Sequence, residues 1–166
     1  DSSSALEMYG SQQAIIPRYA ATALMSTGCT GMIQGTENAV DKKLTFIGYQ
    51  PRAEFKEIPE LSKSIKKINQ IKDTYKTFQT GKNIEFIDNE NSAILACLRF
   101  GKKFNEPDFL IISNFNSTGH QNLSLNLTNY HTHQAKNLFT SEIIDLISIK
   151  DTLLAPSQTL ILEILK

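Results

Sequence analysis

The sequence predicts an α+β protein in which helices dominate the first 80 residues and an all-β antiparallel sandwich occupies residues 81–166. Three observations carry this prediction. Apolar residues recur at helical spacing in two segments before residue 80, and a short apolar run of strand length lies between those segments. After Gly81 the apolar period changes to two, in short segments that polar turns separate.

The first helix is expected to begin near Ala14 or Ile16 and to end before Gly28, because glycine commonly follows the last turn of a helix. Pro17 fits the first turn, where the missing N–H of proline costs little. Residues 29–34 then have the pattern of a short buried strand, and the polar residues 35–38 have that of the loop after it.

The second helix is expected to begin at residues 58–60 and to be closed by Gly81. An apolar stripe runs from Leu61 to Phe78 at helical spacing, and mostly Lys, Ser, Asn and Gln fill the positions between. This pattern predicts an amphipathic helix of about five turns. Residues 42–55, before the helix, show no sustained period and predict an irregular excursion.

A series of short strands is expected after the second helix, with a hairpin turn at Asn89-Glu90-Asn91. Short strands without intervening helices are typical of an antiparallel sandwich. The expected strands are residues 83–88, 92–100, 109–115, 121–127, 135–139, 143–149 and 158–165.

Composition and charge exclude several partner classes. The chain has 166 residues, of which 40% are hydrophobic and 20% charged, as in a globular protein. Basic and acidic residues balance at 17 each, so no overall field attracts nucleic acid or an anionic membrane. The longest apolar runs fall far short of the ~20 residues that span a bilayer. We expect neither a nucleic-acid partner nor a membrane partner.

Two lone cysteines, Cys29 and Cys97, lie in apolar segments. A scaffold stapled by disulfides has several cysteines in loops. We therefore expect two buried free thiols, with a disulfide between them as the alternative.

The order of these parts resembles the C-terminal third of the α-amylase superfamily, glycoside hydrolase family thirteen. Residues 19–28 followed by residues 30–37, TGMIQGTE in one-letter code, resemble the family's seventh barrel helix and an eighth strand that ends in a Gly-x-Glu turn. Residues 68–78 resemble the last barrel helix. Residues 94–100, 109–116 and 154–163 resemble strands of the β-sandwich that the family calls domain C.

The resemblance implies that residues 1–80 are the last helices and strand of a (β/α)8 barrel and that residues 81–166 are domain C, which stabilises the barrel. The chain is then the C-terminal segment of a larger glucan-active glycoside hydrolase or glycosyltransferase, like an α-amylase or a maltosyltransferase. Residues 42–55 favour the maltosyltransferases. The implied partners are an α-glucan or maltooligosaccharide substrate and the rest of the parent chain.

The family's catalytic carboxyl groups have no counterpart here. Retaining glycosidases need two carboxyl groups about 5 Å apart, and the family takes them from its fourth and fifth barrel strands. The 166-residue chain alone is therefore not expected to be active. Asp1 resembles the last letter of the family's Asn-His-Asp motif, whose aspartate stabilises the transition state; the alternative is a terminal residue without a role.

Candidate substrate-binding residues follow the predicted strand. Glu37 would lie at the C-terminal end of a barrel strand, where barrel enzymes place functional groups, or it structures the loop. Gln34 and Asn38 would reach sugar hydroxyls from the same rim. Tyr49 and Arg52 would serve a sugar or a phosphate, because tyrosine stacks on sugar faces and arginine clamps anions.

No cofactor and no metal are expected, because the sequence has no Gly-rich phosphate loop, no cysteine pair at zinc spacing and no serine nucleophile elbow. His131 and His133 have a spacing that can bind a metal. No cysteine lies near them, and solvent-facing histidines in a polar turn are the preferred interpretation.

A second hypothesis makes the chain a non-catalytic carbohydrate-binding or interaction module whose sandwich is the working part. Such a module requires an exposed aromatic platform. The chain has no Trp, and Phe86, Phe100, Phe109 and Phe115 occupy inward-type positions of the alternating pattern, which favours core packing.

A missing barrel has a consequence for the surface. The helix near Ala14 and the strand at residues 29–34 would bury faces against absent barrel elements, leaving an apolar patch. We expect self-association, a rearrangement or other chains to cover that patch.

Overall fold

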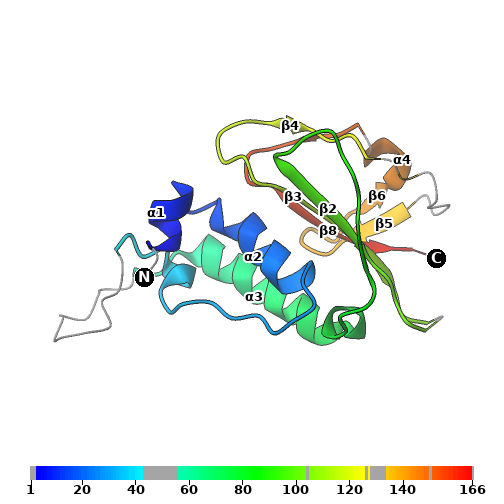
Figure 1. Ribbon diagram of the computed structural model, residues 1–166, viewed down its shortest axis with the longest axis horizontal. Helices are drawn as coiled ribbons and strands as arrows, with labels where there is room; N and C mark the ends of the chain where they lie inside the picture. The colour runs from blue at the N-terminus through cyan, green and yellow to red at the C-terminus, as the bar shows by residue number, and fades with distance from the viewer. Residues whose placement is uncertain are drawn as a thin grey trace.

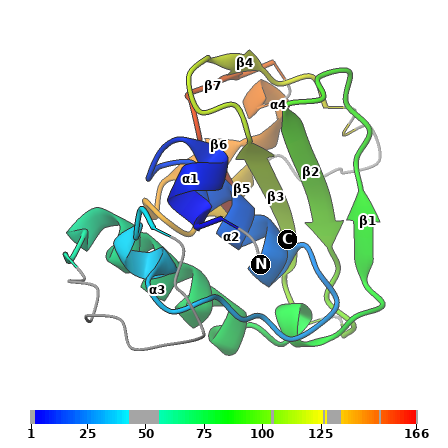
Figure 2. The ribbon, with the colours of Figure 1, turned by 60° about the vertical axis from the view of Figure 1, so that its left-hand side comes forward.

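The protein is built around one antiparallel sheet with a layer on each face. The structure, a computed structural model, describes residues 3–42, 56–103, 105–125, 127, 134–149 and 151–165. Six strands form the main sheet in the order β1-β2-β3-β8-β5-β6, and β4 pairs with β7 in a separate two-stranded sheet. Helices α1, α2 and α3 lie on one face of the main sheet, while β4, β7 and α4 lie on the other (Figures 1 and 2).

The elements in chain order alternate little between helix and strand, as an α+β fold requires. They are α1 (Ala5–Tyr9), α2 (Ile15–Leu24), η1 (Thr36–Asn38), α3 (Pro59–Thr74), η2 (Lys76–Gln79), β1 (Ile84–Phe86), β2 (Ile94–Arg99), β3 (Asp108–Asn114), β4 (Gln121–Asn122), β5 (Gln134–Asn137), β6 (Ile143–Asp145), α4 (Leu146–Ile149), β7 (Leu153–Leu154) and β8 (Thr159–Ile164).

Helix α2 confirms the first predicted helix. It begins at Ile15, and Pro17 lies in its first turn. Ala20, Ala23 and Leu24 are buried on the side that faces α3 and the sheet. The small alanines allow this close packing, because a methyl side chain adds little bulk between helix and sheet.

Helix α3 begins at Pro59 as predicted but ends earlier than the sequence indicated. Pro59 occupies the first helical position, where it has no hydrogen bond to lose. At Tyr75 the backbone turns to an extended conformation with ψ 116°, and the chain continues as η2 with Phe78 buried. The Tyr75 ring then lies edge-on to Phe109 of β3 at 4.8 Å between centroids, so aromatic packing against the sheet ends the helix.

The predicted buried strand at residues 29–34 is wrong in the described structure. These residues form no strand, Cys29 is exposed, and Ile33 is 61% exposed. A strand needs a neighbour to accept and donate its backbone hydrogen bonds, and no described strand lies beside this segment. Lys72 of α3 holds its start instead, donating to the Gly28 carbonyl at 3.3 Å and to the Thr30 hydroxyl.

The sheet is antiparallel throughout, as the period of two predicted. Cys97 of β2, Ile111 of β3 and Ile161 of β8 are cross-strand partners on the face toward the helices. Their neighbours along each strand point to the opposite face and pack under β4, β7 and α4. Burial on both faces explains why the central strands read as nearly continuous apolar runs.

Several predicted strands are shorter than the sequence indicated. The segment 143–149 is a strand only to Asp145, whose carboxylate accepts from the Ile147 amide at 2.9 Å and starts α4. Among the described residues of the segment 121–127 the strand is confined to β4, and β7 was not among the expected strands. Phe86 was expected in the core but is 54% exposed, because β1 is an edge strand with a mostly exposed outer side.

Arg99, the last residue of β2, is fully buried between the helical layer and the sheet. Its Nη1 atom donates to the Ser26 carbonyl at 2.8 Å and to the Leu24 carbonyl at 3.3 Å, both at the C-terminal end of α2. A cation is favourable there, because the unpaired carbonyl groups at a helix end carry partial negative charge. Burial lowers the pKa of Arg99, and the guanidinium is nonetheless the side chain that best retains its charge in proteins.

The second terminal nitrogen of Arg99 serves the chain that connects α3 to the sheet. Its Nη2 atom donates to the Thr77 carbonyl at 2.9 Å, to the Thr80 carbonyl at 2.6 Å and to the Asn83 side-chain oxygen at 3.3 Å. One side chain therefore joins α2, η2, the segment before β1, and β2.

Replacing Arg99 by methionine is expected to lower the free energy of unfolding by about 3 kcal/mol or more, because buried carbonyl groups lose their donor. Arg99→Lys should recover only part of this loss, since an ammonium cannot reproduce the planar fork. Urea unfolding followed by circular dichroism measures both variants. Equal free energies of unfolding for the methionine variant and the wild type would show that the hydrogen bonds of Arg99 do not stabilise the fold.

The Cys97 thiol and the Tyr75 hydroxyl are weak acids whose burial is expected to make the stability of the fold sensitive to alkaline pH. Burial raises the pKa of the Cys97 thiol to about 12, and burial together with the hydrogen bond to Glu163 raises the pKa of Tyr75 to about 12. The unfolded chain loses these protons near pH 9 and pH 10, so the folded state is favoured below pH 9 and loses that advantage as the pH rises toward 12.

Thermal unfolding from pH 8 to pH 12 checks this expectation, with Tyr75→Phe as the matched variant. The melting temperature of the wild type should fall above pH 9, and the phenylalanine variant should fall less steeply above pH 10 because one titrating group is gone. Identical pH profiles for the two proteins would contradict the assignment to Tyr75.

Candidate functional site

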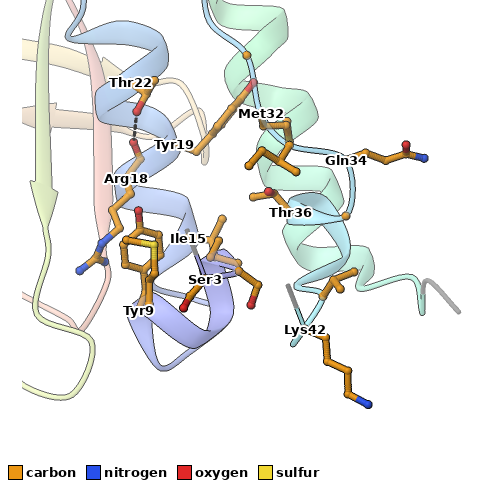
Figure 3. A pocket seen from close by; sticks show the side chains of 17 residues that line it. Ser3, Tyr9, Ile15, Arg18, Tyr19, Thr22, Met32, Gln34, Thr36 and Lys42 are labelled. Carbon is orange, nitrogen blue, oxygen red and sulfur yellow. Dashed lines mark hydrogen bonds between the residues drawn. The ribbon is translucent and has the colours of Figure 1, made fainter. Parts of the chain in front are cut away.

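A pocket of about 420 Å³ lies between α1, α2 and residues 31–36. Figure 3 shows its lining side chains, which come from segments up to 39 residues apart in the chain, from Ser3 to Lys42. The apolar part of the wall includes Met8, Ile15 and Ile33. A pocket of this size and mixed lining is typical of small-molecule sites.

Gln34 lies on the rim of this pocket and is exposed. Its side chain points away from α2 (Figure 3). The residue is accessible, as the sequence hypothesis requires, and the role of its amide in sugar binding stays a prediction.

Glu37 structures the loop. Its carboxylate accepts a hydrogen bond from the Gly35 amide at 3.0 Å, and Gly35 has a φ of 97°, a conformation that glycine adopts at little cost. The Glu37 carbonyl accepts from the Ser62 hydroxyl of α3 at 3.3 Å. Of the two interpretations left open by the sequence, these contacts favour the loop-structuring carboxylate.

Asn38 connects the same loop to the start of α3. Its side-chain amide donates to the Lys56 carbonyl at 3.2 Å. Glu37 and Asn38 belong to the short helix η1, which begins two residues after Gln34. Gln34 lines the pocket, whereas Glu37 and Asn38 are not among its lining residues. The other candidates, Asp1, Tyr49, Arg52, His131 and His133, lie outside the described residues.

Sequence reasoning missed the aromatic and basic part of the pocket wall. The Arg18 guanidinium lies 4.2 Å from the centre of the Tyr9 ring and 5.4 Å from that of Phe115. Tyr19 donates its hydroxyl proton to the Asn69 side-chain oxygen at 2.6 Å. No motif links these positions in the sequence, because folding alone brings α1, α2 and the end of β3 together.

The charges of the pocket do not support acid–base chemistry by themselves. Its charged lining residues are Arg18 and Lys42, and no carboxylate is among the described residues that line it. The paired carboxyl groups of a retaining glycosidase are therefore not found in this pocket.

Within the described ranges no group of three or more His, Cys, Asp or Glu side chains is placed to hold a metal ion. No helix in the same ranges has both the length and the apolar character needed to cross a bilayer. Cys97 is a buried free thiol as predicted, whereas the prediction of burial is wrong for Cys29, which is exposed.

Comparison with solved structures identifies the class of fold. The maltogenic alpha-amylase AmyB from Thermotoga neapolitana matches with a TM-score of 0.78 and 16% sequence identity, over 100% of this chain and 40% of that chain. AmyP in complex with maltose matches with a TM-score of 0.63 and 12% identity, over 92% of this chain and 34% of that chain. An AmyP variant in complex with maltotriose gives the same values.

These matches confirm the resemblance to α-amylases at the level of the fold. The chain spans about two fifths of the length of AmyB and about one third of the length of AmyP. No protein-family model matches the sequence, and no curated protein matches it.

Proposed function

We propose that this chain is the C-terminal segment of a glucan-active glycoside hydrolase or related glycosyltransferase. In this proposal residues 1–80 supply the end of the catalytic barrel and residues 81–166 supply domain C. The observation that carries the proposal is the likeness to AmyB, which extends over the whole chain while using only 40% of that enzyme.

The surface around residues 29–34 supports the same proposal. Cys29 and Ile33 are exposed in a segment of strand-like composition that has no described strand beside it. An apolar segment with unpaired edges is what remains when a sheet is interrupted. A neighbouring barrel strand would pair with its backbone and cover its side chains.

The β-sheet part would act as a stabiliser of the barrel end. Tyr75 and Phe78, which follow α3, pack against Phe109 of the sheet, and Arg99 binds carbonyl groups of both helical segments. These contacts would hold α2 and α3 in fixed positions beside the barrel.

The proposed substrate is an α-glucan or maltooligosaccharide bound by the complete enzyme. The AmyP structures contain maltose and maltotriose. Gln34 and Asn38 would lie on the substrate side, as groups that support binding rather than perform the chemistry, and the Glu37 carboxylate would hold the loop that carries them. Asp1 is proposed as the transition-state stabiliser, and Tyr49 and Arg52 as further sugar contacts.

The alternative of a carbohydrate-binding module has weaker support. Phe86 is the one large aromatic side chain that is more than half exposed among the described residues. A sugar-binding platform stacks several rings side by side, and an isolated phenylalanine on an edge strand does not provide one. Phe109 is fully buried.

Two measurements test the proposed function. The purified chain is expected to show no turnover of maltotriose and no saturable binding of maltooligosaccharides by calorimetry, because the two carboxyl groups are elsewhere. The parent gene should encode, upstream of Asp1, an aspartate after a fourth barrel strand and a glutamate after a fifth. Turnover by the purified chain or absence of those carboxylates would overturn the proposal, and saturable binding would favour the module.

Self-association through the uncovered segment is a further expectation, and Ile33→Lys is expected to reduce it. Light scattering of the wild type should show species larger than a monomer, because Met32 and Ile33 are exposed apolar side chains. Ile143→Lys is the matched control, since Ile143 is 54% exposed on β6 at the other end of the molecule (Figure 1). A monodisperse wild-type monomer, or an equal effect of both lysines, would contradict the assignment to this face.

A further inference from the structure

The segment between α2 and η1 has a defined course although no described strand lies beside it. Residues 31–34 are exposed and form no strand. Fixing the backbone of such a segment costs conformational entropy, which backbone pairing offsets in a sheet. Contacts at the two ends of the segment have to offset that cost here.

Lys72 of α3 holds the start of the segment. Its ammonium group donates to the Gly28 carbonyl at 3.3 Å and to the Thr30 hydroxyl. Hydrogen bonds from an ionised donor are stronger than those between neutral groups. Lys72 is half-buried, and α3 itself is fixed in the core by four buried apolar side chains. The start of the segment is therefore tied to a rigid element.

Ser62 of the same helix holds the other end. Its hydroxyl donates to the Glu37 carbonyl at 3.3 Å. The turn around Glu37 is closed by its own hydrogen bonds, because the Gly35 carbonyl accepts from the Asn38 amide at 3.1 Å and from the Val40 amide at 3.0 Å. Ser62 therefore ties a closed turn, and not a single residue, to α3.

Ala39 shows that this turn is firmly held. Its φ is 45°, in the left-handed region that residues with a Cβ atom rarely adopt. The residue is 7% exposed and belongs to the hydrophobic core. Strained backbone persists where the surrounding contacts determine it, and it is frequent at functional sites. The turn at residues 35–39 is thus pre-organised.

The two contacts on α3 are far enough apart to set the direction of the segment. Ser62 and Lys72 are ten residues apart, about 15 Å along the helix axis. The segment starts beside the C-terminal part of α3 and ends beside its N-terminal part, so it runs antiparallel to the helix (Figure 1). A neighbouring strand that paired with residues 31–34 would leave both contacts in place.

We infer that Lys72 and Ser62 are positioning residues of the proposed glucan site. By tying residues 30–37 to α3 at both ends, they fix the place of Gln34 and Asn38. Side-chain amides both donate to and accept from sugar hydroxyls, and such hydrogen bonds weaken steeply when distance or angle is wrong. The inference rests on the proposed function, in which Gln34 and Asn38 lie on the substrate side.

Nuclear magnetic resonance order parameters of the Gly31 amide test the contact made by Lys72. The wild-type value should be close to that of rigid backbone, about 0.85, and Lys72→Met should lower it below about 0.6. Lys72→Arg should keep the wild-type value, because a guanidinium also donates to carbonyl and hydroxyl oxygens. Lys66→Met is the matched control, since Lys66 is exposed on α3 and forms no hydrogen bond or ion pair with the described residues.

Hydrogen exchange of the Val40 amide tests the contact made by Ser62. Ser62→Ala should accelerate this exchange about 2- to 10-fold, the effect of losing one hydrogen bond. The Tyr75 amide, which donates to the Ile71 carbonyl, should be unchanged because α3 stays folded. Ser64→Ala is the matched control on the same helix. A flexible Gly31 in the wild type, or no effect of either Lys72→Met or Ser62→Ala, would overturn the inference.

Kinetics of the complete parent enzyme separate positioning from a purely structural role. Lys72→Met and Ser62→Ala should raise KM for maltotriose about threefold or more with little change in kcat, and Lys72→Arg should restore KM. A looser segment with an unchanged KM would overturn the positioning role and leave the proposed function intact. A wild-type parent enzyme without activity on α-glucans would overturn the proposed function and the positioning role together, whatever the order parameters show.

Discussion

The buried guanidinium of Arg99 is the constraint that fixes the two halves of the molecule relative to each other. Ionised groups are costly to bury unless hydrogen bonds replace their water. The acceptors for this one are the side-chain oxygen of Asn83 and the carbonyl oxygens of Leu24, Ser26, Thr77 and Thr80. The Ser26 carbonyl follows the C-terminal end of α2, and the Thr77 carbonyl lies in η2, where it also accepts from the Asn83 side-chain amide at 3.1 Å. The helical layer can therefore occupy essentially one position over β2, and Phe78 and Phe109 pack within that position.

That fixed arrangement explains why one side of the helical layer stays uncovered. α2 packs on the sheet and α3 packs on α2, and residues 29–34, which follow α2, are mostly exposed. Lys72 tethers the start of this segment, while Ile33 remains exposed farther along. The pocket lies between α1, α2 and this segment. The exposed side chain of Ile33 is thus also part of the pocket wall.

The sequence correctly predicted the helices and strands in which a periodic apolar pattern extends over several residues. α2, most of α3 and the central strands were predicted because apolar periodicity reports directly on which face is buried. The prediction from periodicity failed at residues 29–34, where an apolar run of strand length has no described strand beside it. It also failed at residues 146–149, where Asp145 starts a helix within a segment that has the pattern of a strand. The sequence identified Glu37 and Asn38 as candidate site residues because both follow the predicted strand. It did not identify Tyr9 and Arg18, because no motif links these two residues of the pocket wall.

The sequence alone determined the α+β class, the antiparallel pairing of the strands and the resemblance to α-amylases, since these depend on the order and period of local segments. Tertiary structure decided the role of Arg99, the exposure of Cys29 and the pocket beside Tyr9. The physical reason is that burial and hydrogen-bond partners depend on residues distant in the chain. Arg99 and Ser26 are joined across 73 residues, a distance that no local pattern encodes.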